Sequence, residues 1–158
     1  MLSESKVSIR PLSEIHAETS YKWRNNPTIW RYTFNKPDRV VSLKMEKEWI
    51  KKVLSNKNER RFAIYYQEIY VGNIYLTSIT EYDAYVGLFL GDPNFHGKGV
   101  GIEALSQVLE FATQHLHLKN IYLRVKKENT PAFRLYSKVG FEIIEEMKEY
   151  FKMKKSLI

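Results

Sequence analysis

The sequence predicts a single α+β domain, and three observations support this prediction. With 158 residues, of which 44% are hydrophobic, the chain is long enough for one domain with its own core. Residues 61–66, 70–80 and 82–91 are rich in Tyr, Val, Ile, Phe and Leu and have short links, as antiparallel strands do. No linker or repeat divides the chain, so the domain covers residues 1–158. From Gly99 onward the apolar residues recur at helical spacing: Ile102, Leu105, Val108, Leu109, Ala112 and Leu116.

The first part of the chain predicts one strand and two helices. Residues 7–12 alternate between apolar and polar side chains and predict a short strand. A helix from Ser13 to about Asn25 follows, because apolar side chains recur there every four residues. Ser42 is suited to cap a second helix. The apolar face of that helix consists of Met45, Trp49, Ile50, Val53 and Leu54.

The later elements are predicted from turn residues and alternation. Residues 67–68 give a tight reversal between the first two of the three central strands. After the long helix, residues 120–126 predict a strand with one apolar face. Residues 129–139 predict a short helix that ends at Gly140. From residue 141 onward the chain has the pattern of a final hairpin.

Composition excludes several classes of protein. The chain has no cysteine, so it can have no disulfide, thiolate metal site or cysteine nucleophile. The four histidines lack metal-ligand spacing, and we expect no metal. No apolar run is long enough for a membrane span, and the first residues lack a signal-peptide core. We therefore expect a cytoplasmic protein. The formal net charge of +7 favours anionic partners.

The segment with the most chemical information is a glycine-rich turn between a strand and a helix. Gly97, Gly99 and Gly101 lack Cβ atoms, so the backbone can approach a ligand closely. The N–H groups and dipole of the helix that follows suit an anion such as phosphate, and Lys98 adds positive charge. The structural alternative is a turn whose glycines serve only tight packing.

Two common phosphate motifs do not fit this turn. No Ser or Thr follows Lys98, so it is not a Walker loop. Residues 99–104 match the dinucleotide pattern G-x-G-x-x-A, but that motif requires a preceding parallel strand and an acidic residue after the next strand. Here the preceding strands are predicted to be antiparallel, and the next strand ends in two lysines. A nicotinamide-binding fold is therefore disfavoured.

Two motifs in sequence order carry a family resemblance. Residues 96–101, H-G-K-G-V-G, resemble the pyrophosphate loop Q/R-x-x-G-x-G/A of the Gcn5-related N-acetyltransferases, or GNAT superfamily. Residues 129–141 are similar to its signature N-x-x-A-x-x-x-Y-x-x-x-G-F. The resemblance implies a GNAT fold, with a central mixed, mostly antiparallel twisted sheet flanked by about four helices. It also implies transfer of acetyl from acetyl-CoA to a primary amine, by direct attack in a ternary complex without a metal.

The resemblance also implies roles for individual residues. The end of the strand at residues 85–90 would splay from its neighbour, so that main-chain groups near Phe89 and Leu90 hydrogen-bond pantetheine. Asn129 would meet the pantetheine arm, although it could equally cap a helix. Tyr136 would protonate the departing sulfur, with a core aromatic as the alternative. The pyrophosphate would be held by the loop residues His96, Gly97, Lys98, Gly99, Val100 and Gly101.

Two positions depart from the family pattern. His96 stands where the loop usually has Gln or Arg. Arg124 stands where some amine acetyltransferases have a glutamate base. The base is therefore unassigned: an ordered water is one option, and the side chains near predicted strand ends are Glu81, Asp83, Tyr85 and His96.

The acceptor is expected to bind to the first half of the chain. Arg24-Asn25, Trp49 and Asp92-Pro93 resemble the branch that holds ribosomal-protein N-terminal, polyamine and aminosugar-nucleotide acetyltransferases. The positive net charge disfavours a polyamine, which leaves an aminosugar nucleotide or a protein N-terminus as the favoured acceptors. The expected acceptor contacts are Arg24, Asn25, Trp30 and Trp49, with Tyr32 nearby.

Two other functions remain as alternatives. One is a coenzyme A-binding protein without catalysis. The other is a basic nucleic-acid-binding module, suggested by Tyr and Phe interleaved with Lys and Arg, although no basic stripe stands out in the sequence. For the acetyltransferase, the expected partners are acetyl-CoA and an amine, with no membrane and no nucleic acid, and with a homodimer left open.

Overall fold

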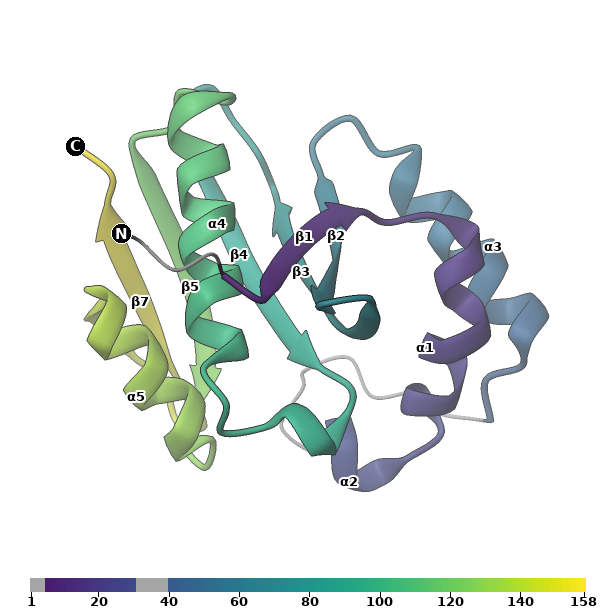
Figure 1. The fold of residues 1–158 in the computed structure, drawn as a ribbon. Helices are drawn as coiled ribbons and strands as arrows, with labels where there is room; N and C mark the ends of the chain where they lie inside the picture. Colours follow the sequence, from purple (N-terminus) through teal and green to yellow (C-terminus); the bar gives the residue numbers. More distant parts are fainter. Residues whose placement is uncertain (1–4, 31–39) are drawn as a thin grey trace.

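The computed structural model describes residues 5–30 and 40–158, and its ribbon is drawn in Figure 1. The predicted order of elements is confirmed. The strands are β1 (Val7–Pro11), β2 (Arg60–Tyr66), β3 (Ile69–Thr77), β4 (Asp83–Leu90), β5 (Asn120–Lys126), β6 (Glu142–Glu146) and β7 (Tyr150–Ser156). The helices are α1 (Ala17–Arg24), α2 (Pro27–Trp30), α3 (Leu43–Leu54), α4 (Val100–Gln114) and α5 (Thr130–Val139), with 3-10 turns η1 (Glu14–His16) and η2 (Pro93–Phe95).

Local sequence signals account for several of these boundaries. The Ser42 hydroxyl accepts a hydrogen bond from the Met45 N–H at 3.1 Å, which confirms the predicted cap of α3. Gly140 ends α5 with φ of 112°, a conformation that favours glycine. Asn25 and Asn26 end α1 as predicted, but Pro27 then starts the one-turn helix α2, which the sequence analysis did not include.

The described strands form one sheet in the order β1-β2-β3-β4-β5-β7-β6. Only β4 and β5 are parallel; every other neighbouring pair is antiparallel. This arrangement confirms a mixed, mostly antiparallel sheet, and it separates the two halves of the molecule at the β4–β5 boundary.

Two cores lie on opposite faces of this sheet. Ile64 belongs to the larger core, with α4 and α5, whereas its neighbour Ala63 packs with Ile50 of α3 in the smaller one. Successive residues of a strand point to opposite faces, so the two helical layers sandwich the sheet. In Figure 1, α4 and α5 lie over the β4–β7 half, and α1 and α3 lie at the β1–β3 end.

The pairing between β4 and β5 is short. Only Asp83, Ala84 and Tyr85 of β4 pair with β5, at residues 120–122. Beyond Tyr85, β4 continues to Leu90 and β5 continues to Lys126 without pairing to each other. The splay that the family resemblance implied is therefore present. Within the described part of the chain, no helix has the length and apolar character needed to cross a membrane.

Candidate active site

A cleft of about 1210 Å³ runs between the separated ends of β4 and β5. At one end it is lined by Gly97, Gly99 and Gly101, at the start of α4. At the other end it is lined by Arg24 of α1 and Trp49 of α3, which belong to the opposite layer. The cleft therefore connects the two faces of the sheet, and two ligands can enter it from opposite sides.

The glycine turn leaves the start of α4 open. Gly97 and Gly99 have φ of 75° and 77°, and a Cβ atom at either position would meet no other atom within 4 Å. Gly99 is the N-cap residue of α4, and because glycine has no side chain it cannot cap the helix with one. Among the described residues, no side chain accepts from the first amides of this helix. These amides can therefore bind an anion in the cleft.

His96 fastens the turn to β4. Its Nε2 lies 2.9 Å from the carbonyl oxygen of Leu90, and this nitrogen must carry the proton because a carbonyl can only accept. His96 also lines the cleft, although its side chain is largely exposed. His96, which stands where the family usually has Gln or Arg, thus contacts β4, the strand expected to bind pantetheine.

The direction of the peptide groups in β4 determines which of its main-chain groups are open to a ligand. The N–H of Gly91 donates to Val71 of β3 at 2.9 Å, so the preceding carbonyl, that of Leu90, points away from β3. Because peptide groups alternate along a strand, the main-chain groups of Phe89 face β3, where Phe89 pairs with Asn73. Leu88 and Leu90 present their N–H and C=O groups to the open side. Near Phe89 and Leu90, the main-chain groups that are open to a ligand are thus those of Leu88 and Leu90, while Phe89 lines the cleft.

Asn129 and Tyr136 have the structural roles given as their alternatives, and both also line the cleft. The side-chain oxygen of Asn129 accepts from the Ala132 N–H at 3.3 Å, which makes it the cap of α5, and the residue also lines the cleft. Tyr136 is a core residue whose ring packs edge-on against Phe141, and it lines the cleft as well. Burial, with a smaller effect of Tyr75, raises the pKa of Tyr136 well above its ordinary value. The phenol therefore keeps its proton at neutral pH.

Tyr75 is a site residue that the sequence analysis missed. It is partly buried, lines the cleft, and lies against Gly87, which is two residues beyond the last position of β4 that pairs with β5. A Cβ atom at position 87 would lie 2.0 Å from Cε2 and 2.6 Å from the hydroxyl oxygen of Tyr75. Burial raises the pKa of Tyr75, and the neighbouring Arg61 partly opposes this rise. A glycine in the strand at 87 was the one sequence signal for a close approach.

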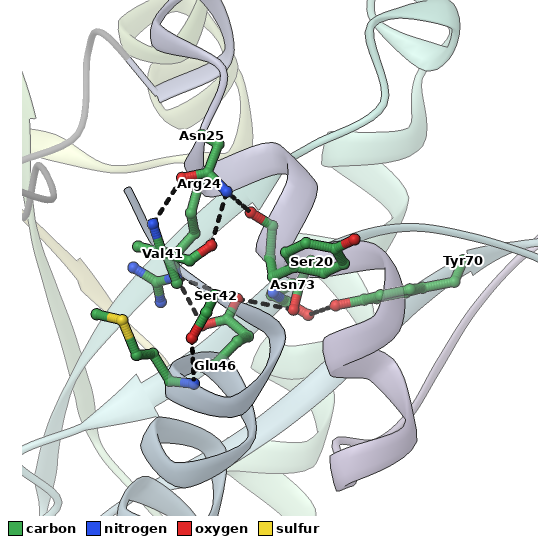
Figure 2. A network of polar contacts seen from close by, with 10 residues as sticks. Ser20, Arg24, Asn25, Val41, Ser42, Glu46, Tyr70 and Asn73 are labelled. Carbon is green, nitrogen blue, oxygen red and sulfur yellow. Dashed lines mark hydrogen bonds and ion pairs between the residues drawn. The ribbon is translucent and has the colours of Figure 1, made fainter. Parts of the chain in front are cut away.

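The Arg24 side chain is held by a buried carboxylate. Its Nε lies 2.9 Å from Oε1 of Glu46, whose side chain is only 2% exposed. The Ser20 hydroxyl donates to the other carboxylate oxygen at 2.8 Å. Figure 2 shows this network between α1 and α3. The guanidinium carbon of Arg24 also lies 4.2 Å from the ring centre of Trp49. Arg24 and Trp49 thus form one wall of the cleft.

The other two expected acceptor contacts are Asn25 and Trp30, and only Asn25 has a described side chain. The Asn25 side chain donates to the carbonyl of Val41 and accepts from its N–H, both at 2.7 Å, as Figure 2 shows. Asn25 does not line the cleft, so it has a structural role in place of the expected acceptor contact. Trp30 ends α2, but its side chain lies outside the described part of the structure, as does all of Tyr32.

Of the four candidate bases, Tyr85 and His96 line the cleft, whereas Glu81 and Asp83 do not. Glu81 is exposed and outside the cleft, and Asp83 accepts a hydrogen bond from Asn120 at 3.0 Å. Among the described residues, the carboxylates that line the cleft are Glu46 and Glu59. Each is paired with an arginine, Glu46 with Arg24 and Glu59 with Arg61. The described residues also contain no cluster of His, Asp and Glu that could hold a metal ion.

Residues 6–142 match the family described as the acetyltransferase (GNAT) domain. The chain belongs to the GNAT acetyltransferase family. This membership agrees with the splayed strands, the open start of α4 and the position of Tyr136. As a member of this family, the chain is an acetyl-CoA-dependent N-acetyltransferase, and the family-level expectations for fold, coenzyme and reaction class are confirmed.

Curated relatives cover nearly the whole of this GNAT chain. Acetyltransferase PseH of Campylobacter jejuni is 25% identical over 148 residues, 92% of this chain and 90% of the relative. Spermidine N(1)-acetyltransferase of Escherichia coli is 29% identical over 154 residues, 96% of this chain and 81% of the relative. Both are acetyltransferases, and neither is similar enough to transfer an acceptor to this chain.

Solved structures confirm the fold. Spermidine N-acetyltransferase from Vibrio cholerae, in complex with CoA and spermine, aligns with a TM-score of 0.88 at 24% identity, covering 98% of this chain and 97% of that one. N-acetyltransferase PseH of Campylobacter jejuni in complex with acetyl coenzyme A aligns with a TM-score of 0.74 at 21% identity. The alignment covers 95% of this chain and 98% of that one. At these identities the likeness establishes the GNAT fold.

Glu46→Gln tests the buried ion pair. The substitution keeps the side-chain shape but leaves the partly buried Arg24 without its counter-charge, so we expect the free energy of unfolding to fall by about 3 kcal/mol. The control is Glu68→Gln, which removes an exposed pair with Arg10 and should cost under about 1 kcal/mol. Denaturant unfolding measures both. Equal costs would contradict the structural role of Glu46.

Gly87→Ala tests the approach of Tyr75. The new methyl group must displace the Tyr75 ring, so we expect a loss of about 1–3 kcal/mol of unfolding free energy and a lower acetylation rate. In a Tyr75→Leu background the clash disappears, and the same alanine substitution should cost clearly less. A double-mutant cycle by denaturant unfolding measures this coupling. Identical costs in the two backgrounds would show that the ring does not restrict position 87.

Proposed function

We propose that this GNAT enzyme acetylates the primary amine of an acceptor that carries negative charge, by direct attack within a ternary complex. One observation carries the proposal: a continuous cleft joins the open start of α4, on one face of the sheet, to an arginine-lined pocket on the other. A protein that only bound coenzyme A would have no need for this second pocket.

The coenzyme end of the cleft is assigned to acetyl-CoA. The free amides at the start of α4, together with Lys98, are suited to the pyrophosphate. The main-chain groups of Leu88 and Leu90 have no strand partner on the open side, so an extended pantetheine arm can pair with them as a further strand would. One N–H in this stretch would polarise the thioester carbonyl.

The chemical step needs little beyond positioning, because the thioester is already activated. The amine lone pair attacks the carbonyl carbon, the carbon–sulfur bond breaks, and the thiolate takes a proton from the Tyr136 hydroxyl. The ammonium proton leaves toward water, since both described carboxylates of the cleft are paired with arginines. The raised pKa of Tyr136 supports the acid role, because the group stays protonated until the thiolate forms.

The acceptor end of the cleft supports an acceptor with an anionic group. A polycation would need unpaired carboxylates, and those at Glu46 and Glu59 are already neutralised by Arg24 and Arg61. Arg124 and Lys126 line the same cleft, so basic side chains outnumber the carboxylates in its lining. We therefore favour an aminosugar nucleotide or a protein N-terminus over a polyamine, and we retain the cytoplasm as the proposed compartment.

Binding of acetyl-CoA is the first test. A ligand of the folded state at 100 times its Kd should stabilise the protein by about 2.7 kcal/mol, which thermal unfolding detects as a higher Tm. Gly99→Asp places a negative charge at the start of α4 and should abolish the shift. Gly99→Asn, which adopts the same left-handed conformation without the charge, is the matched control and should retain a shift. No shift in the unmodified protein at millimolar acetyl-CoA would reject the proposed function.

Tyr136→Phe tests the acid. We expect the turnover number to fall by about 10²-fold or more with the Kd for acetyl-CoA unchanged, because only the proton donor is lost. Tyr66→Phe, at a tyrosine that packs on Phe95 outside the cleft, is the control and should leave turnover intact. Steady-state rates over an amine panel measure both variants. An unaltered rate in Tyr136→Phe would remove this residue from the mechanism.

A further inference from the structure

Strand alternation gathers tyrosines and lysines on one face of the sheet beside the cleft. In β5, Ile121, Leu123 and Val125 point into the core under α4 and α5, so the intervening Tyr122 and Arg124 point to the opposite face. By the same alternation, that face receives Lys152 and Lys154 of β7, on either side of the buried Met153, and Tyr85 of β4. We call Tyr85, Tyr122, Lys152 and Lys154 the tyrosine–lysine face.

The four side chains contact one another. The Tyr85 and Tyr122 rings lie 5.7 Å apart, between residues paired in the parallel register. The Lys152 ammonium lies 5.5 Å from the Tyr85 ring centre and 5.2 Å from that of Tyr122, and the Lys154 ammonium lies 5.8 Å from Tyr122. A hydrogen bond with the Tyr85 hydroxyl raises the pKa of Lys152, so this amine is charged at neutral pH. All four side chains remain partly accessible.

The two lysines contact the tyrosine rings, and they also face acidic residues of the neighbouring strand β6. In register, Lys152 faces Glu145 and Lys154 faces Glu142 on the edge strand β6. Among the described ion pairs, however, neither lysine is joined to a glutamate. Asp83, the acid at the start of β4, already accepts from Asn120. The Lys152 ammonium therefore lies near the two tyrosine rings, and the charge of Glu145 on β6 contributes to its raised pKa without forming a described ion pair.

The tyrosine–lysine face is continuous with the acceptor side of the cleft. Tyr85 belongs to both, and it lies on the same face as Gly87, only two residues or about 7 Å before it. Arg124, in register with Lys152, also lines the cleft. An amine that reaches the thioester near Gly87 can therefore be attached, through a group of roughly sugar size, to an anion held by the two lysines.

We propose that the tyrosine–lysine face binds the phosphate ester of the acceptor, with the tyrosine rings beside the group that the ester carries. The inference rests on the proposed function and narrows its substrate class to amines that bear a phosphate or diphosphate about one sugar ring from the nitrogen. A nucleotide-linked amino sugar has this chemistry. Ammonium groups supply the charge for phosphate, and tyrosine rings offer stacking surface to a nucleobase.

A binding experiment tests the site directly. Uridine diphosphate, inorganic pyrophosphate and uridine are titrated by calorimetry into the enzyme saturated with coenzyme A, so that the glycine turn is already occupied. We expect uridine diphosphate to bind most tightly and uridine most weakly. The double variant Lys152→Gln and Lys154→Gln should raise the Kd for uridine diphosphate by at least about tenfold, which is a loss of roughly 1.4 kcal/mol of binding free energy. The control, Lys52→Gln with Lys57→Gln, removes the same charge from exposed positions outside the cleft and should stay within about twofold.

A kinetic experiment separates this inference from the proposed function. Acetylation of glucosamine is compared with acetylation of glucosamine 6-phosphate, whose amine and phosphate ester lie on opposite sides of the sugar ring, in the unmodified enzyme and in the lysine double variant. The unmodified enzyme should show a KM about tenfold or more lower for the phosphate ester, and the lysine double variant should lose this preference while keeping its acetyl-CoA thermal shift. An active enzyme with no preference, or an unchanged preference in the double variant, overturns the inference and leaves the acetyltransferase intact. Tighter binding of single-stranded oligonucleotide than of uridine diphosphate also overturns it, in favour of a nucleic-acid surface.

Discussion

The structure depends on the early end of one strand pairing. β4 and β5 are parallel neighbours for only three residues each, and their main chains then separate. Parallel strands usually continue their ladder, because unpaired N–H and C=O groups in a protein interior are costly. Here Leu88 and Leu90 present such groups to a cleft, and among them only the Leu90 carbonyl has a described partner, His96. The fold therefore reserves a strip of main chain for a ligand.

Packing on both faces of the sheet keeps the strands apart. On the α4 side, Gly101 lies close to the side chains of Leu88 and Leu135, which brings the start of α4 against β4. On the other side, Tyr75 occupies the space above Gly87, and Trp23 occupies the space above Gly91. Larger residues at these glycines would push the layers away from β4. Close packing by two separate cores thus holds the sides of the cleft apart, and the glycine turn before α4 lines one end of it.

Features with local causes could be predicted from the sequence. The cap at Ser42, the end of α5 at Gly140 and the strand at residues 120–126 each depend on a few neighbouring residues, and each was found where expected. The two GNAT motifs likewise lie in short stretches, so the coenzyme end of the cleft could be located before the fold was known.

Features with tertiary causes could not be predicted. Arg24 stood out in the sequence, but its partner Glu46 lies on another helix and resembles any solvent-facing glutamate of α3. Asn25 looked like an acceptor contact, yet its amide is used by the main chain of Val41, 16 residues away. The sequence could not tell which main-chain groups near Phe89 face the cleft, because only the pairing with β3 fixes this. The tyrosine–lysine face could not be found in the sequence, because its residues come from strands that are distant in the sequence.

The two ends of the cleft are built from different kinds of chemical group, which is why the proposed acceptor can differ between members that share the GNAT fold and the coenzyme. The coenzyme end uses main-chain amides, and these are available to any sequence that keeps the glycines and the splay. The acceptor end is built from side chains of α1, α3, β2 and β5, where each substitution changes charge. In this chain the described carboxylates of that end are bound to arginines, and Arg124 adds a further cation where some family members have a glutamate base. Under the proposed function, the acceptor's own charge therefore decides how well it fits this end, while the coenzyme end stays the same.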